Sequence, residues 1–291
     1  MLTPTSEYFA PETMKEACSL LAKYKQQARV IAGGTDLLVK MKRKETLPRY
    51  IINISGVRDQ DYITYDKKTG LRIGSATSIR SIELSPVIKE KFGLLAEASG
   101  MLGSKQVRNR ATLAGNLCNA APSAETAPPL MVLGATLKIM GDDGERTIPV
   151  EDFWTGPGQT VLKPDELLAE IQIPEPAPRS GGVYMAHGVR KAMEIAIVGV
   201  AVIVTLDSDV IKDVKIGLGA VAPTPIRARK AEEAIRGKKI DDDLLQKAGK
   251  NAAEECSCID DIRSSAENRM NMVRVLVARA IKEAVARANK G

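Results

Sequence analysis

Apolar positions in the first third of the chain follow two different spacings. Residues 11–25 carry them at helical intervals behind a Pro-Glu-Thr start, which predicts a helix. Residues 28–34 predict a buried strand that stops on two glycines, and an apolar run resumes directly after Thr35 and Asp36. The other elements predicted here are two short strands and a helix, at 50–55, 70–79 and 85–102.

The middle third predicts a mixture of helix and sheet. Residues 111–135 contain no aromatic side chain and predict a loop that leads into a buried helix at 128–135. Residues 135–153 predict a hairpin with Asp-Asp-Gly as its turn, and residues 165–176 predict a strand that ends on prolines.

The last third begins after residues 174–182, which hold three prolines and two glycines and form the best linker candidate. Residues 195–221 predict buried strands that pair as a hairpin or meander. Three helices are predicted beyond them, at 229–237, 241–257 and 264–288. The last of these starts at a serine cap and has a predicted apolar face formed by Met272, Val275, Leu276, Arg279 and Ala280.

Size and composition are typical of a globular protein with more than one core. The 291 residues exceed the usual size of a single core, so two or three are expected. No run approaches ~18 consecutive apolar residues, which predicts no transmembrane segment. The N-terminus also lacks the basic-then-apolar order of a secretory signal, so we expect a cytoplasmic protein.

Charge and ligand counts exclude several classes of function. The net charge of +6 is mild for this length and the basic residues are not interleaved with aromatics, so no nucleic-acid partner is expected. Four cysteines without an export signal predict free thiols. Cys256-Ser257-Cys258 offers too few thiolates for an iron–sulfur cluster, and His187 is the only histidine. We therefore expect no metal in this chain.

The Gly33-Gly34-Thr35 sequence suits an anion. Glycine permits positive φ and lets backbone amides converge on a ligand. Consecutive exposed amides form an anion-binding nest, whose usual ligand is phosphate or pyrophosphate. A tight strand connection explains the same residues without a ligand. No G-x-G-x-x-G follows a strand and Lys40 is not placed as a P-loop lysine, so any nucleotide site must use another scaffold.

A second loop, Thr112 to Asn116, is also built from small residues with a hydroxyl and an amide. Small residues continue through 119–126 up to Glu125, before Pro128-Pro129 starts an apolar helix. A large flat ligand pressed on backbone needs such residues, and so does tight packing of a helix on a strand.

Two stretches carry a resemblance to a known family: Ala-Gly-Gly-Thr-Asp-Leu at 32–37 and Val-Arg-Asn-Arg-Ala-Thr-Leu-Ala-Gly-Asn at 107–116. They resemble the FAD-binding medium subunits of molybdenum hydroxylases, such as xanthine dehydrogenase and carbon monoxide dehydrogenase. Val-Ala-Pro-Thr-Pro at 221–225, Asp-Ile-Arg at 261–263 and the last helix resemble the C-terminal domain of that family.

The resemblance implies an α+β fold that covers nearly the whole chain. An FAD-binding domain of the vanillyl-alcohol-oxidase (PCMH) type would have two α/β subdomains, at 1–55 and 56–176. A small C-terminal α+β domain with a short antiparallel sheet and helices would follow at 177–291.

The resemblance also implies which residues bind FAD. The first loop would wrap the pyrophosphate with backbone amides, and the second would hold it from the other side and run towards the isoalloxazine. Glu125 would hydrogen-bond the cofactor, and Leu102 and Leu168 would line it. The full set is Val30, Ile31, Ala32, Gly33, Gly34, Thr35, Asp36, Leu37, Leu102, Thr112, Leu113, Ala114, Gly115, Asn116, Glu125 and Leu168.

This sequence departs from the family pattern at several positions. Ala114 replaces a glycine of the second loop, which is tolerable if φ stays negative. Ala186 stands where the family often has a lysine near the flavin, and a cation there stabilises reduced, anionic flavin. Asn268 stands where a tyrosine is common, at a position interpreted as structural. Residues 116–128 carry no cysteine-bearing insertion, so no [4Fe–4S] cluster is predicted.

The function implied is that of an electron-transfer flavoprotein subunit. A molybdopterin-binding large subunit and a [2Fe–2S] small subunit would be its partners, in a heterotrimer or its dimer, and FAD would pass electrons to NAD+, a quinone or another acceptor. A stand-alone FAD-dependent oxidoreductase of the same fold is the alternative, and a non-catalytic nucleotide-binding module is a third reading. No side chain is assigned an acid–base role. We favour a structural role for His187. Tyr184 is equally consistent with a position over one face of the flavin and with a place in the core or at an interface.

Overall fold

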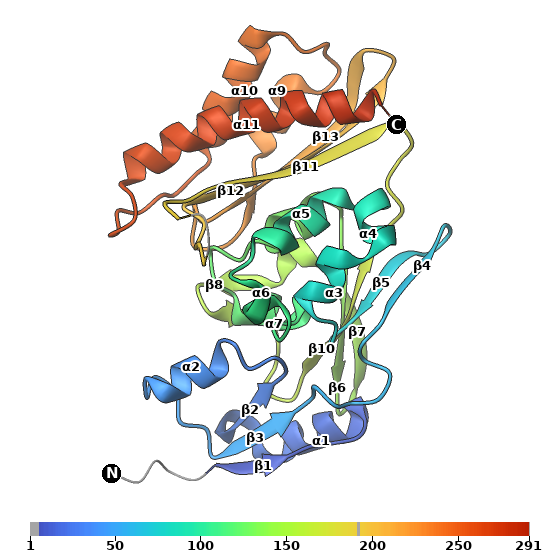
Figure 1. Cartoon of the computed structure of the whole chain (residues 1–291), viewed down its shortest axis with the longest axis vertical. Helices are drawn as coiled ribbons and strands as arrows, with labels where there is room; N and C mark the ends of the chain where they lie inside the picture. Colours follow the sequence, from blue (N-terminus) through green and yellow to red (C-terminus); the bar gives the residue numbers. More distant parts are fainter. Residues whose placement is uncertain (1–5, 191–192, 291) are drawn as a thin grey trace.

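The computed structural model describes residues 6–190 and 193–290. Three larger sheets follow one another along the long axis of the molecule, with a group of short helices packed between the last two (Figure 1); β8 (Trp154–Gly156) and β9 (Gln159–Thr160) form a further two-stranded sheet. Helices and sheets are interspersed along the chain, so the predicted α+β class is confirmed.

The first sheet is parallel and has the strand order β1-β3-β2. Its strands are β1 (Glu7–Phe9), β2 (Ala28–Ile31) and β3 (Tyr50–Asn53). Helix α1 (Met14–Tyr24) begins at Thr13, whose side chain accepts a hydrogen bond from the Glu16 amide. The strand β2 ends at Ile31, and a short turn leads into α2 (Leu37–Lys42).

The second sheet is antiparallel and has the order β4-β5-β10-β6-β7. Its strands are β4 (Ile63–Asp66), β5 (Gly70–Gly74), β6 (Thr136–Gly141), β7 (Gly144–Pro149) and β10 (Leu167–Ile173). The predicted hairpin is therefore confirmed as β6 and β7. The helices that follow β5 are α3 (Ile79–Leu84), α4 (Pro86–Lys91), α5 (Gly93–Met101), α6 (Lys105–Arg108), α7 (Leu113–Asn119) and α8 (Ala127–Val132). Smaller elements are η1 (Lys25–Gln27) and η2 (Val150–Asp152).

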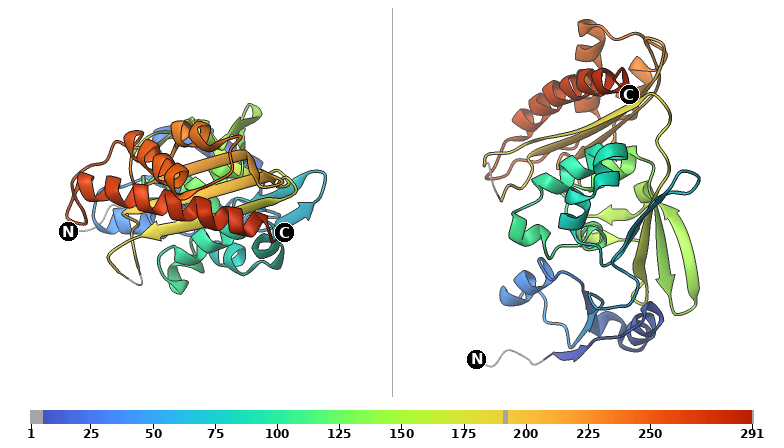
Figure 2. Two further views of the ribbon diagram at one scale, coloured as in Figure 1. Left: turned by 90° about the horizontal axis from the view of Figure 1, so that it is seen from above. Right: turned by 45° about the vertical axis from the view of Figure 1, so that its right-hand side comes forward.

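The third sheet is antiparallel and is covered by helices on both faces. Its strands are β11 (Ser180–His187), β12 (Val198–Asp207), β13 (Val210–Gly219) and β14 (Ile226–Arg227), in chain order. Helix α11 (Ala266–Ala288) lies along β11 and β12 with α10 (Asp242–Glu254) beside it, and α9 (Arg229–Ile235) packs on α10 and β13. Helices α5 and α8 contact the opposite face, which joins this sheet to the central part of the molecule (Figure 2).

The structure corrects three predictions about helices. The helix predicted at 85–102 is two helices, because Phe92 leaves helical geometry (φ −128°, ψ 39°) and places its fully buried ring in the core. The segment predicted as loop contains α7, because Thr112 caps a turn of small residues that helical hydrophobic spacing does not reveal.

The third correction concerns the buried face of α11. Its buried residues are Arg269, Val273, Val277, Ala280, Ile281, Ala284 and Ala288. Of the five residues predicted to face inward only Ala280 is buried; Met272 and Leu276 are half-buried, and Val275 and Arg279 are exposed. The buried stripe begins at Arg269, a charged residue that hydrophobic spacing does not assign to a buried face. The predicted serine cap is confirmed at Ser265.

Candidate functional site

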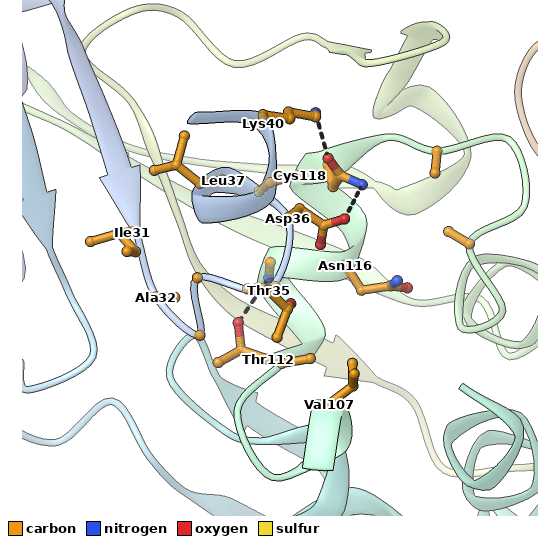
Figure 3. A pocket seen from close by; sticks show the side chains of 18 of the residues that line it. Ile31, Ala32, Thr35, Asp36, Leu37, Lys40, Val107, Thr112, Asn116 and Cys118 are labelled. Carbon is orange, nitrogen blue, oxygen red and sulfur yellow. Dashed lines mark hydrogen bonds between the residues drawn. The ribbon is translucent and has the colours of Figure 1, made fainter. Parts of the chain in front are cut away.

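A cavity of about 940 Å³ lies between the loop after β2, the helices α6 and α7, and the start of β10 (Figure 3). Fifteen of the sixteen residues predicted to bind FAD line it. The exception is Leu113, whose side chain is fully buried in the core of the central part. Among the described residues, no aromatic side chain lines this cavity.

Two consecutive glycines shape the first loop for different reasons. Gly34 has a φ of +76°, in the left-handed region that favours glycine. Gly33 lies so close to residues 110–111, which lead into the second loop, that a Cβ on it would collide with the backbone of Arg110. The double glycine therefore ends β2 and lets the two loops meet backbone to backbone.

The amides of the first loop make no hydrogen bond within the described part of the protein. Within residues 6–190 and 193–290, the amides of Gly33, Gly34 and Thr35 have no hydrogen-bond acceptor, although all three residues line the cavity. Consecutive amides of this kind form an anion-binding concavity.

The second loop is fixed by its own side chains. The Thr112 hydroxyl accepts a hydrogen bond from the Gly115 amide at 3.0 Å and so caps α7 (Figure 3). The side-chain carbonyl of Asn116 accepts a hydrogen bond from the Thr126 hydroxyl at 2.5 Å. This contact fastens the start of α7 to the turn that carries Glu125.

A polar bridge joins the two loops. Lys40 donates through Nζ to the side-chain oxygen of Asn119 at 2.8 Å, and the Asn119 side-chain amide donates to Asp36 at 3.1 Å (Figure 3). The bridge links α2 to α7 and so connects the first loop to the second.

The wall formed by β10 is held by an ion pair. Arg146 on β7 donates through Nε and Nη2 to the two carboxylate oxygens of Glu166, at 2.9 and 2.8 Å, and also donates to the Val161 carbonyl. These hydrogen bonds hold the pKa of Glu166 below its usual range. They fix the segment that leads into Leu168 on the cavity wall.

The pKa of the Glu125 carboxyl is shifted in the opposite direction to that of Glu166. Burial raises its pKa to about 7, and the carboxylates of Asp36 and Glu194 push it in the same direction.

Sequence reasoning missed several residues that hold the cavity in shape. The buried side chain of Arg108 donates to the Leu102 carbonyl at 2.8 Å and to Glu83, and so fixes the turn before α6. Arg108 lies inside residues 107–116, which carry the family resemblance, so the sequence did offer a reason to single it out. It offered no such reason for Arg146, because its partner Glu166 lies 20 residues away.

The structure locates each departure from the family pattern. Ala114 lies in α7, where its backbone is helical and φ is negative, so the extra methyl is tolerated. Ala186 lies on β11 and packs against the central core outside the cavity lining, as does Tyr184, which is buried. Asn268 is exposed in the first turn of α11 and donates to Ser264 and Ser265.

These features fit FAD. A cradle that a Cβ on Gly33 would fill, free amides beside it, and a long cavity lined by small and aliphatic residues suit a dinucleotide whose pyrophosphate is pressed on backbone.

In the described part of the chain, no three His, Cys, Asp or Glu residues gather as a metal site, and all four cysteines are free. None of the described helices combines the length and apolar content needed to cross a bilayer.

Comparison with known proteins agrees with this geometry. Residues 4–176 match the family "FAD binding domain in molybdopterin dehydrogenase", and residues 184–284 match the "CO dehydrogenase flavoprotein C-terminal domain". The xanthine dehydrogenase FAD-binding subunit of Escherichia coli O157:H7 is 31% identical over 97% of each chain. The carbon monoxide dehydrogenase medium chain of Hydrogenophaga pseudoflava is 30% identical over 99% of each.

Solved structures give the same result. The carbon monoxide dehydrogenase structure from H. pseudoflava that lacks the Mo-pyranopterin moiety superimposes with a TM-score of 0.94 and 32% identity, over 99% of each chain. The chain therefore belongs to the FAD-binding medium subunits of the xanthine dehydrogenase and carbon monoxide dehydrogenase family, and its cofactor is FAD.

Proposed function

We propose that this subunit holds FAD in the cavity between its two backbone loops and transfers electrons through it. The FAD would receive electrons from [2Fe–2S] clusters of a partner subunit and pass them to an external acceptor such as NAD+ or a quinone. The observation that carries the site assignment is the meeting of the loops at Gly33 and Arg110, beside amides that have no acceptor among the described residues.

Each wall of the cavity has a defined task in this proposal. The amides of Gly33, Gly34 and Thr35 bind the pyrophosphate from one side, and the loop from Thr112 to Asn116 binds it from the other. Leu102 and Leu168 provide apolar walls that exclude water, and Glu125 hydrogen-bonds the cofactor.

The redox chemistry belongs to the cofactor. FAD, when bound, accepts and releases the electrons, while the protein supplies binding, orientation and electrostatics. Ala186 places no cation on β11, so this chain would stabilise negative charge on the flavin less than a relative with lysine there.

The partners are inferred from the names of the relatives. "FAD-binding subunit" and "medium chain" describe proteins that work with other chains, and the similarity runs over nearly the full length. We propose a molybdopterin-binding large subunit and a [2Fe–2S] small subunit, in a heterotrimer or its dimer. Relatives about equally similar act on different compounds, among them caffeine and nicotine, so the substrate is set outside this chain.

We also propose the domain division 1–55, 56–176 and 177–291. Three separate hydrophobic clusters support it, although Leu167 and Ala169 of β10 pack into the cluster of the first sheet.

The purified chain tests the site. We expect a flavin absorbance spectrum with about one FAD per chain, identified by mass after release. Reduction of this flavin by a reduced [2Fe–2S] partner would then support the electron-transfer role. A colourless protein that does not take up added FAD would refute the site assignment.

A further inference from the structure

Arg269 is a charged side chain inside the core formed by the third sheet and its helices. It lies in the first turn of α11, is 1% exposed, and begins a buried stripe whose other members are valine, alanine and isoleucine. Removal of a guanidinium from water is costly unless polar groups receive it. An aliphatic residue would fill this position for packing alone, so the polar contacts of Arg269 are the reason to consider a further role.

Those contacts are two backbone carbonyls and one carboxylate. Nη1 of Arg269 donates to the Ile197 carbonyl at 2.8 Å and to the Ala220 carbonyl at 3.3 Å. Nη2 lies 2.8 Å from Oδ1 of Asp261, as an ion pair rather than an aligned hydrogen bond. One guanidinium therefore ties the chain that enters β12 to the chain that leaves β13.

The first carbonyl is close to the cavity along the chain. Glu194 and Ile195 line the cavity, and only Ala196 separates them from Ile197. Ile197 also donates its amide to the His187 carbonyl at 2.8 Å, so both backbone polar groups of this residue are bound. The anchor at Ile197 thus fixes the end of a segment that forms part of the cavity wall.

The second carbonyl is connected to the cavity through a turn. Ala220 has a φ of +64°, a left-handed conformation that is unfavourable for alanine. Its amide donates to the Pro122 carbonyl at 2.7 Å and its carbonyl accepts from Arg269, so the residue is held on both sides. Pro122 lies between Ala121 and Ser123, which both line the cavity. These hydrogen bonds offset the unfavourable backbone and link α11 to the cavity wall.

We propose that Arg269 is a positioning residue for the FAD site, although it lies outside the cavity lining. It holds the segment before β12 directly, and it holds the turn at 121–125 through Ala220 and Pro122. Two parts of the cavity wall are thereby fixed from one buried side chain in the core of the third sheet. The inference rests on the proposed FAD site.

The affinity for FAD, compared with stability, tests this role. Arg269→Met keeps the length of the side chain but cannot donate to either carbonyl. Its FAD affinity, measured by titration of the FAD-free chain, should weaken about tenfold. Arg269→Lys keeps a cation that can donate to the same carbonyls and should recover most of the lost affinity.

Ile281→Ala is the matched control. Ile281 is fully buried further along the same helix and lies outside the cavity lining. Its truncation lowers the free energy of unfolding, so it reproduces a packing defect of α11 without removing a contact to Ile197 or Ala220. Its FAD affinity should stay within about twofold of wild type, at a temperature where urea denaturation shows every variant to be folded.

Each outcome decides the inference. A loss of affinity in Arg269→Met that is largely recovered in Arg269→Lys and absent in Ile281→Ala supports it. Wild-type affinity in Arg269→Met overturns it, as does an equal loss in Ile281→Ala or a lysine variant as weak as methionine. The FAD site stands in each of these cases. A wild-type chain that does not bind FAD overturns the site and the inference together.

A second variant decides the question if Arg269→Met does not fold. Asp261→Asn keeps the oxygen that accepts from the Arg263 and Ser264 amides but removes the charge that faces Arg269. It should weaken the affinity for FAD about threefold. Unchanged affinity in Asp261→Asn would then overturn the inference.

Discussion

The carbonyl oxygen of Arg110 lies 1.9 Å from the point that a Cβ on Gly33 would occupy. The next two nearest atoms, also backbone, would lie at 2.6 and 2.9 Å. No rotation of a side chain relieves such contacts, so the two loops can meet only if residue 33 is glycine.

Gly33→Ala should therefore separate the loops. We expect the variant to lose most of its FAD on purification and to be destabilised by about 2 kcal/mol, in the range of overpacked cores. FAD per chain and urea denaturation measure the two effects.

Gly56→Ala is the matched control, because a Cβ at this exposed glycine has nothing within 4 Å. It should retain FAD and change the free energy of unfolding by less than about 0.5 kcal/mol. Full FAD content in Gly33→Ala would show that the close approach of the loops is not needed.

The collision at Gly33 also shows where sequence reasoning stops. The double glycine indicated a special backbone, but its cause is a carbonyl 77 positions along the chain, which no local pattern reveals. The resemblance brought the two loops together, whereas spacing alone favoured a tight strand connection. Arg146 shows the same limit, since its partner on the cavity wall is a tertiary neighbour.

For the fold, the local sequence pattern was sufficient where an element is set by residues close together in the chain. The hairpin of β6 and β7 and the caps of α1 and α11 follow from turn and cap chemistry within a few residues. Pattern failed for α7, because its small residues show no helical spacing of apolar positions. It also failed at Phe92, which leaves helical geometry and has its ring fully buried.

Thr112→Val should loosen the start of α7. Valine has the same shape but leaves the Gly115 amide without its 3.0 Å acceptor, which costs about 1 kcal/mol at an N-cap. We expect a lower unfolding free energy and a several-fold weaker affinity for FAD, measured by titration of the FAD-free chain. Thr112→Ser keeps the hydroxyl and should stay close to wild type in both measurements, whereas a valine variant that matches wild type would show that the hydroxyl cap is not needed.

Arg146→Met should weaken the wall formed by β10. Glu166 would stay buried without its partner, and because Arg146 is itself partly exposed we expect about 2 kcal/mol, between surface and buried pairs. Lys138→Met, which breaks the Lys138–Glu145 pair on the adjacent hairpin, should cost under about 1 kcal/mol.

The same variant should change how stability depends on pH. The pKa of Glu166 is lowered in the folded protein, so its contribution is complete above the unfolded value of about 4.3 and is lost as pH falls through the folded value. The difference between wild type and Arg146→Met should thus be largest at neutral pH and shrink below about pH 4. A difference that stays constant from neutral to acid pH would show that packing, not charge, holds Arg146.

Glu97 on α5 joins the central helices to the third sheet, and Arg287 completes the contact. One carboxylate oxygen of Glu97 accepts from the Tyr184 amide at 2.9 Å, and the other accepts from Arg287, which also donates to the Gly182 carbonyl. Glu97→Leu leaves the Tyr184 amide unsatisfied and should cost about 2 kcal/mol of unfolding free energy.

A double-mutant cycle with Arg287→Met tests whether the two side chains act together. Each single variant removes the same ion pair, so the double variant should lose about 1 kcal/mol less than the sum of the two. Unfolding in urea, followed by circular dichroism, supplies the four free energies. Strictly additive losses would show that Glu97 and Arg287 hold β11 independently. A coupled loss would show that one ion pair fixes the strand that carries Tyr184.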